Sequence, residues 1–444
     1  MSETATKTAP PLEKKTTVGN YFVSNYPPFS FWKQEEVPDY RTALGQPPKP
    51  ETPLGIYVHI PFCRKRCHFC YFRVYTDKNS KEIRNYIDAV LAELKLYAKQ
   101  NFIGGRKPKF VYFGGGTPSY LSESQLRELT DGMKELLPWD EVEEVTFECE
   151  PGTLREKKLE ILHEIGVTRL SLGVENFDDH ILELNGRAHR GPEIGRAYEF
   201  AQGLGFPQIN IDLIAGMVEE TEENWKACIE RTREMAPDSV TIYQMEVPYN
   251  TGIYQQMKAD GKLTAPVADW DTKRRWVNDG YTALEQDGYT VSSAYTAVKD
   301  KARTSFVYRD RLWAGADLLS LGVASFGHIG GTHYQNLHDF APYIECIDRG
   351  GLPVYRALTP SDEERLIREF ILQMKLGHIK FSYFNEKFGT NAAERFAKPL
   401  QTIKDWGFAT VDGDDLRLNR EGLLQVDRLL HEFFLDEHRN ARYA

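Results

Sequence analysis

Long apolar runs are absent from this sequence of 444 residues, and none approaches the roughly 18 apolar residues of a membrane-spanning helix. Residues 1–17 are polar and lack the apolar core of a signal peptide, so we expect a disordered tail there rather than a secretion signal. Excess positive charge is also absent, and the formal net charge of −10 argues against general binding to nucleic acid or anionic membranes. These absences predict a cytoplasmic protein with no membrane span and no nucleic-acid partner.

Cysteine is scarce, with 6 residues in the chain, which argues against a disulfide scaffold and indicates a reducing compartment. Three of the six nevertheless gather in one loop, at a C-x3-C-x2-C spacing formed by Cys63, Cys67 and Cys70. Three thiolates can hold three irons of a [4Fe–4S] cube, and the loop has no fourth cysteine to close the remaining iron. An open iron indicates chemistry at the cluster rather than electron relay alone.

Two other interpretations of this loop are a zinc site and a set of reduced structural thiols. Structural zinc takes four ligands at C-x2-C-like spacings. His68 lies between the second and third cysteines, where it is poorly placed to complete such a site. We therefore favour the cluster and predict Cys63, Cys67 and Cys70 as its metal ligands.

The chain length predicts two domains, or one large and one small, and 41% hydrophobic residues suffice for a sizeable core. From residue 55 a short β-branched run, a turn and a helical segment recur. We predict strands at 55–61, 109–115, 144–150, 169–175, 208–215 and 239–246. We predict the intervening helices near 80–100, 122–137, 154–165, 191–204 and 221–235. Such alternation forms parallel βα units, and six units predict a partial barrel rather than the closed eight-stranded form.

The two ends of the chain differ from this repeat. Residues 18–54 are rich in aromatic side chains, and they either pack on the outside of the barrel or form a strap over its open mouth. Residues 55–358 hold the barrel and its extension, and the segment 359–444 is helical, with a hairpin at 408–418 and a last helix at 420–435. These C-terminal elements predict a winged-helix-like cap, whose acidic hairpin favours covering a substrate over binding DNA.

The run Y-V-H-I-P-F that begins at Tyr57, followed by C-x3-C-x-F-C, resembles the radical S-adenosylmethionine (SAM) superfamily. Within it, the chain resembles the oxygen-independent coproporphyrinogen III oxidase-like family, which also contains class C methyltransferases and heme chaperones. From Gly55 onward the resemblance implies an α/β fold, with a partial (β/α)6 radical SAM barrel and a C-terminal winged-helix-like helical cap. It implies a [4Fe–4S] cluster whose open iron binds SAM, cleavage of SAM to a 5′-deoxyadenosyl radical, and an electron donor such as flavodoxin or ferredoxin.

Candidate SAM-binding residues lie near the ends of the predicted strands, where βα barrels place their sites. Glycines after the second strand let backbone approach a ligand closely, and Asp212 inside an apolar strand is costly to bury unless it binds something. Glu175 replaces the family's glutamine, and Arg187 can balance the added charge; Met245 is also suited to a core position. The resemblance implies cofactor contacts at Tyr57, Phe69, Gly115, Gly116, Thr117, Glu148, Glu175, Arg187, Asp212, Met245 and Phe326, the last in a region where a second SAM can bind.

The reaction is less constrained, because one fold hosts many radical reactions. Phe72 stands where the family's oxidases carry a further cysteine, and residues 308–313 replace the chaperones' H-N-x-x-Y-W motif. We therefore expect methyl transfer, or another radical modification of a small organic substrate. The alternatives are oxidative decarboxylation of coproporphyrinogen III in porphyrin biosynthesis and a non-catalytic heme chaperone. The candidates for contact with the substrate are Tyr308, Arg309, Arg311 and His328.

Overall fold

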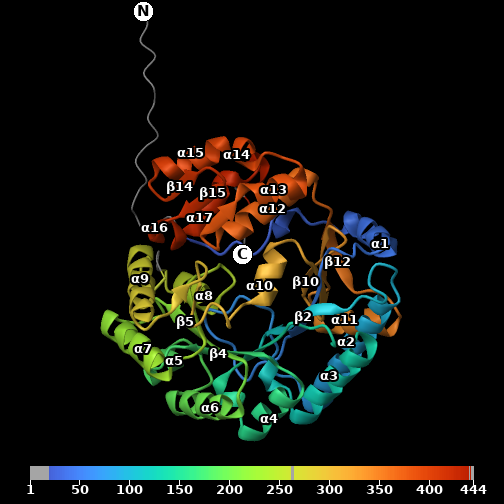
Figure 1. Cartoon of the computed structure of the whole chain (residues 1–444). Helices are drawn as coiled ribbons and strands as arrows, with labels where there is room; N and C mark the ends of the chain where they lie inside the picture. The colour runs from blue at the N-terminus through green and yellow to red at the C-terminus, as the bar shows by residue number, and fades with distance from the viewer. Residues whose placement is uncertain (1–19, 262–264, 440, 442–444) are drawn as a thin grey trace, which may run out of the picture.

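The computed structural model describes residues 20–261, 265–439 and 441, so the tail expected at residues 1–17 lies outside the described residues. Among them, a sheet of 12 strands runs in the order β12-β11-β10-β9-β1-β2-β3-β4-β5-β6-β8-β7 (Figure 1). Its central strands are β1 (Leu54–Ile60), β2 (Pro108–Gly115), β3 (Glu144–Cys149), β4 (Arg169–Glu175), β5 (Gln208–Ala215) and β6 (Ser239–Gln244). These six pair in parallel and curve into an incomplete barrel, which confirms the six predicted strands and the fold class.

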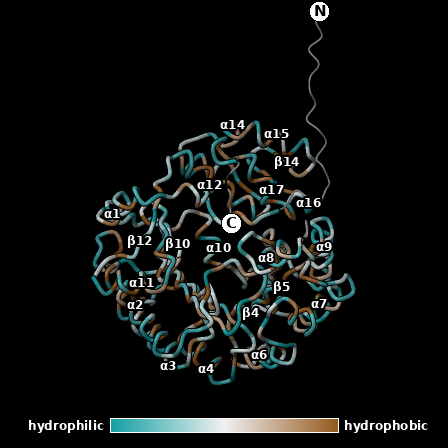
Figure 2. Tube along the Cα trace, turned by 180° about the vertical axis from the view of Figure 1, so that it is seen from behind, coloured by the Kyte–Doolittle hydropathy of each residue, from teal (hydrophilic) through white to brown (hydrophobic). Residues whose placement is uncertain are grey.

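Helices alternate with these strands and cover the outside of the barrel. The predicted helices are confirmed as α2 (Ser80–Ala98), α3 (Glu123–Leu136), α4 (Glu156–Glu164), α6 (Gly191–Leu204) and α7 (Glu222–Met235). The structure adds α1 (Val37–Gly45) and α5 (Asp179–Leu184), which are too short to show a clear helical period. Hydrophilic residues recur around the outer rim of the ring (Figure 2), as expected where helices face solvent. No helix in the described ranges combines the length and apolar character needed to cross a membrane.

Further strands extend both edges of the parallel region. The added strands are β7 (Thr290–Val291), β8 (Thr296–Val298), β9 (Asp317–Leu321), β10 (Phe326–Ile329), β11 (Thr332–Asn336) and β12 (Val354–Leu358). On one edge β9 is parallel to β1, and β10, β11 and β12 then continue antiparallel. On the other edge β8 and β7 are added beyond β6 in antiparallel pairs. The barrel is therefore incomplete between these two flanks.

A short helix, α10 (Val307–Trp313), closes the end of the barrel at which the parallel strands begin. It lies inside the ring of strands in Figure 1 and contacts β2 and β3. Glu144, at the start of β3, accepts hydrogen bonds from the backbone N–H groups of Val307 (2.9 Å) and Tyr308 (3.1 Å). A carboxylate at a helix N-terminus satisfies free N–H groups and interacts favourably with the helix dipole. We call the barrel interior the lumen and this end of it the floor.

The C-terminal domain lies across the opening between the flanks (Figure 1). Its elements are α12 (Asp362–Met374), β13 (His378–Lys380), α13 (Phe381–Phe388), α14 (Ala392–Arg395), α15 (Ala397–Asp405), β14 (Ala409–Asp412), β15 (Asp415–Leu418), α16 (Arg420–Leu423) and α17 (Val426–Leu430). The predicted hairpin is confirmed as β14 and β15, which join β13 in a three-stranded sheet. The single helix predicted at 420–435 is wrong, because the chain turns between α16 and α17, where the Leu424 carbonyl accepts a hydrogen bond from Gln244 (2.8 Å).

The described part of the predicted N-terminal strap, residues 20–54, runs between the barrel and the C-terminal domain. The N–H of Val23 donates to Asp427 of α17 (2.9 Å), and the N–H of Phe22 donates to Glu246, just beyond β6 (2.8 Å). Further along, an isolated β-bridge pairs Lys33 of the strap with Ala357 of β12. The strap therefore contacts both flanks of the barrel as well as the domain that lies across the opening.

Candidate functional site

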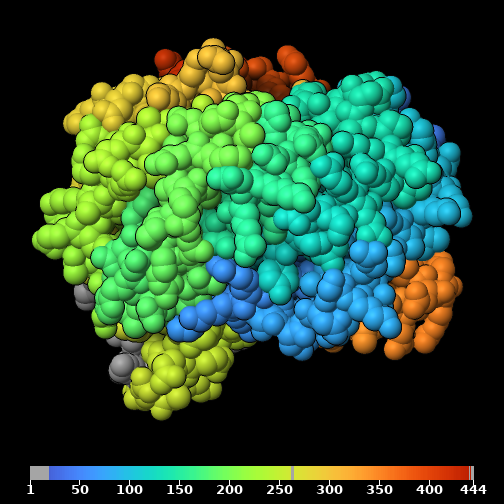
Figure 3. Space-filling view, turned by 90° about the horizontal axis from the view of Figure 1, so that it is seen from below, coloured from blue at the N-terminus to red at the C-terminus, as the bar shows by residue number. Residues whose placement is uncertain are grey.

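The three predicted ligand cysteines lie in the loop that follows β1. Figure 3 shows this loop, in blue, beside the yellow-green α8 (Gly252–Ala259). The two segments are joined by a hydrogen bond from the N–H of Ile253 to the carbonyl of His68 (3.0 Å). All three cysteines are free thiols. The loop is thus anchored at the carboxyl ends of the parallel strands, with its thiols available as ligands.

Two side chains from neighbouring strand ends donate hydrogen bonds to these thiols. The Thr117 hydroxyl, in the turn after β2, donates to Cys63 Sγ at 3.3 Å. The Arg187 guanidinium, from the loop after α5, donates to Cys67 Sγ at 3.3 Å. Donors and positive charge stabilise the thiolate form, which is the form that binds iron.

The arrangement fits a cluster better than a single metal ion. Within the described ranges, no three Cys, His, Asp or Glu side chains converge closely enough to hold one metal ion. The ring of His68, the extra ligand that zinc would need, instead makes a hydrogen bond with the carbonyl of Leu184 (3.0 Å). In an iron–sulfur cluster each thiolate binds its own iron, so the sulfurs need not converge on one point. The donor set therefore fits the predicted cluster and not the zinc alternative.

The glycine-rich turn after β2 packs tightly against the start of the cysteine loop. A Cβ at Gly116 would lie 2.8 Å from the carbonyl oxygen of Ile60, and one at Gly115 would lie 2.5 Å from the ring of His59. Gly115 also has a φ of 111°, which L side chains rarely adopt. Close packing within the protein thus explains both glycines, and their predicted contact with a cofactor stays a prediction.

Three carboxylates of the lumen lie near the ends of neighbouring strands and form what we call the acidic group: Glu148, Glu175 and Asp212. Glu148 accepts hydrogen bonds from the Tyr112 hydroxyl (2.6 Å) and the Gly115 N–H (3.1 Å). Asp212 accepts a hydrogen bond from the Ser171 hydroxyl (2.8 Å). The sequence-based prediction of Glu148, Glu175 and Asp212 as neighbours is therefore consistent with the geometry.

Burial and mutual repulsion shift the titration of the acidic group. Burial raises the pKa of Glu148 to about 7, and the negative charge of Asp212 adds to this effect. Burial also raises the pKa of Glu175 to about 7, although Arg187, 3.6 Å away, opposes the shift. Burial raises the pKa of Asp212 as well. A cationic ligand would relieve this repulsion and restore the charged carboxylates.

Two of the predicted cofactor residues, Met245 and Phe69, meet in a small apolar cluster. Met245 is buried beside Met217, and Phe69 of the cysteine loop packs against the same group. The structure separates Phe326 from these residues, because its ring packs against Phe29 of the strap (centroids 4.3 Å apart). The expected second SAM region therefore contacts the strap, although Phe326 itself remains 36% exposed.

The lumen is open to solvent, as Tyr243 demonstrates. Tyr243 shares the inner face of β6 with Thr241, whose hydroxyl donates to Asn210 of β5. Nevertheless 42% of the surface of Tyr243 is exposed. Tyr71 and Phe72, on the cysteine loop, are similarly exposed, and their rings lie 4.6 Å apart. Exposed aromatic residues of this kind commonly mark a ligand-binding surface. Neither Tyr243 nor Tyr71 was predicted, although the alternation of β6 would have placed Tyr243 inside.

Two buried arginines lie at the floor. Arg169, the first residue of β4, is 2% exposed and donates through Nη1 to the Ser239 hydroxyl across the lumen (3.1 Å). Arg309, on α10, is 8% exposed and donates through Nε to Asp310 (2.8 Å). Arg169 was missed in the sequence analysis, although period-2 alternation along β4 places it on the same face as Ser171.

The other predicted substrate-side residues have different surroundings. Tyr308 lines the lumen beside Tyr112, with ring centroids 4.3 Å apart. The prediction for Arg311 is wrong, because its exposed side chain pairs with Glu143 on the surface (3.0 Å). Two positions along a helix point in different directions, so Arg309 and Arg311 cannot share a face. His328 is buried under the strap, where its ring contacts that of His333.

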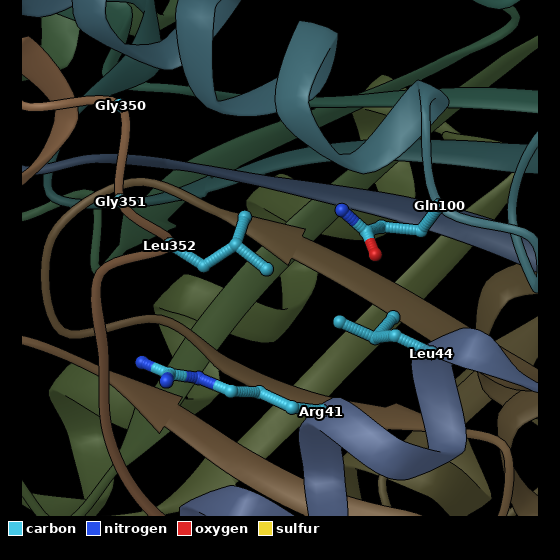
Figure 4. Close-up of a pocket in the computed structure, with 6 residues that line it drawn as sticks. All are labelled: Arg41, Leu44, Gln100, Gly350, Gly351 and Leu352. Atoms are coloured by element: carbon cyan, nitrogen blue, oxygen red, sulfur yellow. The ribbon is translucent and has the colours of Figure 1, made fainter.

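A separate cavity of about 360 Å³ lies outside the barrel (Figure 4). It is formed where α1, the chain after α2 and the chain before β12 meet, and is lined by Arg41, Leu44, Gln100, Gly350, Gly351 and Leu352. None of these residues belongs to the acidic group, the cysteine loop or the floor. The cavity is therefore distinct from the candidate site.

Comparison with protein families gives two matches along the chain. A model described as the radical SAM superfamily matches residues 57–232, which span β1 to α7. A model described as the HemN C-terminal domain matches residues 361–424, which span α12 to α16. The first match contains the cysteine loop and the acidic group.

Similar proteins extend over most of the chain. The heme chaperone HemW of Bacillus subtilis is 29% identical over 384 residues, which cover 85% of this chain and 98% of that protein. The oxygen-independent coproporphyrinogen III oxidase of Escherichia coli is 26% identical over 391 residues, covering 85% of this chain and 84% of that protein. The solved structure of coproporphyrinogen III oxidase (HemN) from Escherichia coli matches with a TM-score of 0.79 at 23% identity, over 93% of this chain and 96% of that one. That structural match shows the shared fold.

Proposed function

Because the chain is a radical SAM protein with a HemN-type C-terminal domain, we propose that Cys63, Cys67 and Cys70 hold a [4Fe–4S] cluster beside a SAM site in the lumen. The observation that carries the proposal is the position of three free thiols at the same end of the barrel as the partly buried acidic group. When bound, the cluster supplies the electron that cleaves SAM to a 5′-deoxyadenosyl radical.

Two side chains around the thiols prepare this site. Thr117 and Arg187 each donate to a thiol, and Arg187 also donates to the carbonyl of Gly173 (2.5 Å), which fixes its guanidinium. A fixed positive charge offsets the negative charge of three thiolates and lies between the cysteine loop and Glu175. Arg187 thereby joins the cluster loop to the acidic group.

The acidic group supplies acceptors for the charged and polar parts of SAM, which carries a sulfonium and an ammonium group. Glu148 and Asp212 are already oriented by neutral donors, so a cation would meet carboxylates that need little reorganisation. Met245 and Phe69 offer an apolar surface on which an adenine ring could pack. The strap packs against Phe326 and would help to exclude water from a reactive radical.

For the reaction we propose the oxidative decarboxylation of a tetrapyrrole side chain. In this reaction a propionate group first loses one hydrogen atom to the radical. It then releases CO2 and passes one electron to an acceptor, which leaves a vinyl group. Support comes from relatives named oxygen-independent coproporphyrinogen III oxidase, which this chain matches over most of their length. These relatives give no support to the methyl transfer expected from Phe72. The aromatic residues that line the open lumen, Tyr243 and Tyr308 among them, suit a large ring-containing substrate.

A second candidate is heme binding without catalysis, which the match to nearly the full length of HemW favours. One experiment separates the two candidates. Anaerobically reconstituted protein is given SAM, a reductant, an electron acceptor and coproporphyrinogen III, and the products are measured. Vinyl product and 5′-deoxyadenosine together support the oxidase. Stoichiometric heme binding without either product supports the chaperone, and S-adenosylhomocysteine would instead indicate methyl transfer.

A further inference from the structure

The floor of the lumen has an electrostatic character opposite to that of the cysteine end. Helical spacing puts Phe306, the residue before α10, on the same face as Arg309 and Trp313 of that helix. The Arg309 guanidinium lies 5.6 Å from the centroid of the Phe306 ring. On β4, Arg169 places its guanidinium 4.4 Å from the same ring centroid. Two guanidinium groups therefore share one aromatic ring at the floor.

Each of these arginines keeps a buried N–H group without a partner. The unpartnered atoms are Arg169 Nε and Arg309 Nη1. Leaving a buried donor unsatisfied costs free energy, and more for a charged group. Proteins rarely accept such a cost twice at one place unless a ligand or an ordered water completes the hydrogen bonds.

The nearby carboxylates do not complete the set. Glu144 already accepts three hydrogen bonds, from the N–H groups of Val307 and Tyr308 and from the Thr146 hydroxyl. Asp310 accepts from Arg309 Nε but is itself partly exposed at the outer side of α10. In the part of the chain that the structure describes, Arg169 forms no ion pair. The floor thus has spare hydrogen-bond donors.

We propose that Arg169 and Arg309 form a carboxylate-binding subsite at the floor, which takes an anionic end of the substrate while the acidic group takes SAM. For the identity of that substrate the inference rests on the proposed function. One carboxylate has two oxygens, so it accepts a hydrogen bond from each unpartnered N–H, and such charge-assisted bonds are strong. The lumen between the two ends provides the path, along which Tyr243 is 42% exposed and Tyr308 partly buried.

The test compares Arg309→Gln with Arg311→Gln, a matched control two residues away on the same helix whose partner Glu143 is at the surface. The probes are coproporphyrin III and its tetramethyl ester, titrated by fluorescence into reconstituted protein. We expect Arg309→Gln to weaken binding of coproporphyrin III about tenfold or more. Arg311→Gln should bind like the wild type, and the ester should bind all three proteins alike. Unchanged SAM binding and thermal unfolding in Arg309→Gln show that the variant is folded.

Equal affinity of wild type and Arg309→Gln for coproporphyrin III would overturn the subsite, and ordered water would then satisfy the arginines. If the wild type binds no porphyrin, the proposed function fails, and a second measurement still decides the inference. The melting temperature is then compared in succinate and in chloride at equal ionic strength. A rise in succinate that Arg309→Gln loses and Arg311→Gln keeps supports the subsite. No difference between the two variants overturns it.

Discussion

The two ends of one lumen present different side chains. Near the carboxyl ends of the strands lie Glu148, Glu175 and Asp212, and Arg187 joins Glu175 to the cysteine loop. At the floor, two arginines face an aromatic ring, and the nearest carboxylate is engaged with the N-terminus of α10. The arginines are almost fully buried and keep unpartnered N–H groups, whereas the three carboxylates are partly buried. The difference teaches that the barrel is an oriented site, with carboxylates at one end and spare N–H donors at the other.

The ends also differ in how the chain builds them. The cysteines lie in a loop that follows β1, where residues can vary without loss of the sheet, whereas the acidic group lies on β3, β4 and β5. The floor consists of a helix seated on Glu144, so its side chains are held by a regular element. Changes at one end should therefore leave the other intact, and the following predictions test that independence.

The largest effect is expected from the triple variant Cys63→Ala, Cys67→Ala, Cys70→Ala. It removes the three proposed iron ligands, so the reconstituted protein should hold no cluster, against about four irons and four sulfides in the wild type. Iron and sulfide analysis with absorption spectra measures this. Porphyrin binding at the floor should persist. A triple variant that still holds a full cluster in this loop would refute the assignment.

The next effect concerns a buried carboxylate outside the lumen. Glu93 of α2 is fully buried and accepts hydrogen bonds from the Gly322 N–H, Tyr343 and Asn336. Burial raises its pKa from 4.5 to about 7, so the folded protein binds this proton more tightly than the unfolded chain. The resulting stabilisation is complete below about pH 4.5 and is lost as the pH rises to about 7. The shift in pKa corresponds to a stabilisation of about 3 kcal/mol.

Glu93→Gln should remove this pH dependence. Relative to the variant, the wild type should lose on the order of 3 kcal/mol in free energy of unfolding between about pH 5 and 8. Denaturant unfolding of cluster-free protein under reducing conditions measures the difference. Saturating SAM should not change it, because Glu93 is satisfied by protein donors and lies outside the lumen. Parallel pH curves for the two proteins would contradict this account.

A smaller effect separates the two ends directly. Asp212→Asn keeps the shape of the side chain and removes its charge, so SAM should bind about tenfold to hundredfold more weakly while the cluster still forms. Coproporphyrin III should bind the variant at least as well as the wild type, since the lumen becomes less negative. Calorimetry with SAM and fluorescence titration with the porphyrin provide the two readouts. An unchanged SAM isotherm would remove Asp212 from the site.

The smallest effect is expected for Arg311→Gln. Its ion pair with Glu143 is exposed, and such pairs contribute between about 0 and 1 kcal/mol. Stability should change by no more than about 0.5 kcal/mol, and both ligand affinities should be unchanged. A strong loss of porphyrin binding in this variant would mean that the outer face of α10, not the lumen, contacts the substrate.

Local patterns were sufficient to predict the parallel strands and the candidate ligands. Each strand has its own β-branched run, and the cysteine spacing lies within eight residues, so neither depends on distant contacts. Asp212 was predictable for the same reason, since a carboxylate within an apolar strand is conspicuous in the sequence alone.

The floor could not be predicted, because it depends on contacts between distant parts of the chain. Glu144 holds the start of α10 from 163 positions earlier in the sequence, and nothing near either segment indicates the pairing. In the sequence alone Arg169 is an ordinary residue at the start of a strand, and only its partners on β5 and β6 reveal its place at the floor. The break between α16 and α17 arises similarly, from Gln244, 180 positions away.

The strap has a consequence for how the protein matures during synthesis. Val23 hydrogen-bonds to Asp427, 404 positions later, and Tyr26 to His438, 412 positions later. At about 5–20 residues per second, a ribosome needs roughly 20 to 80 seconds to make the partner segments. Until then the barrel units can form from neighbouring strands and helices, while the aromatic strap has nothing to dock on. The strap is thus among the last segments to dock, and its contacts with the C-terminal domain form only when translation of that domain is complete.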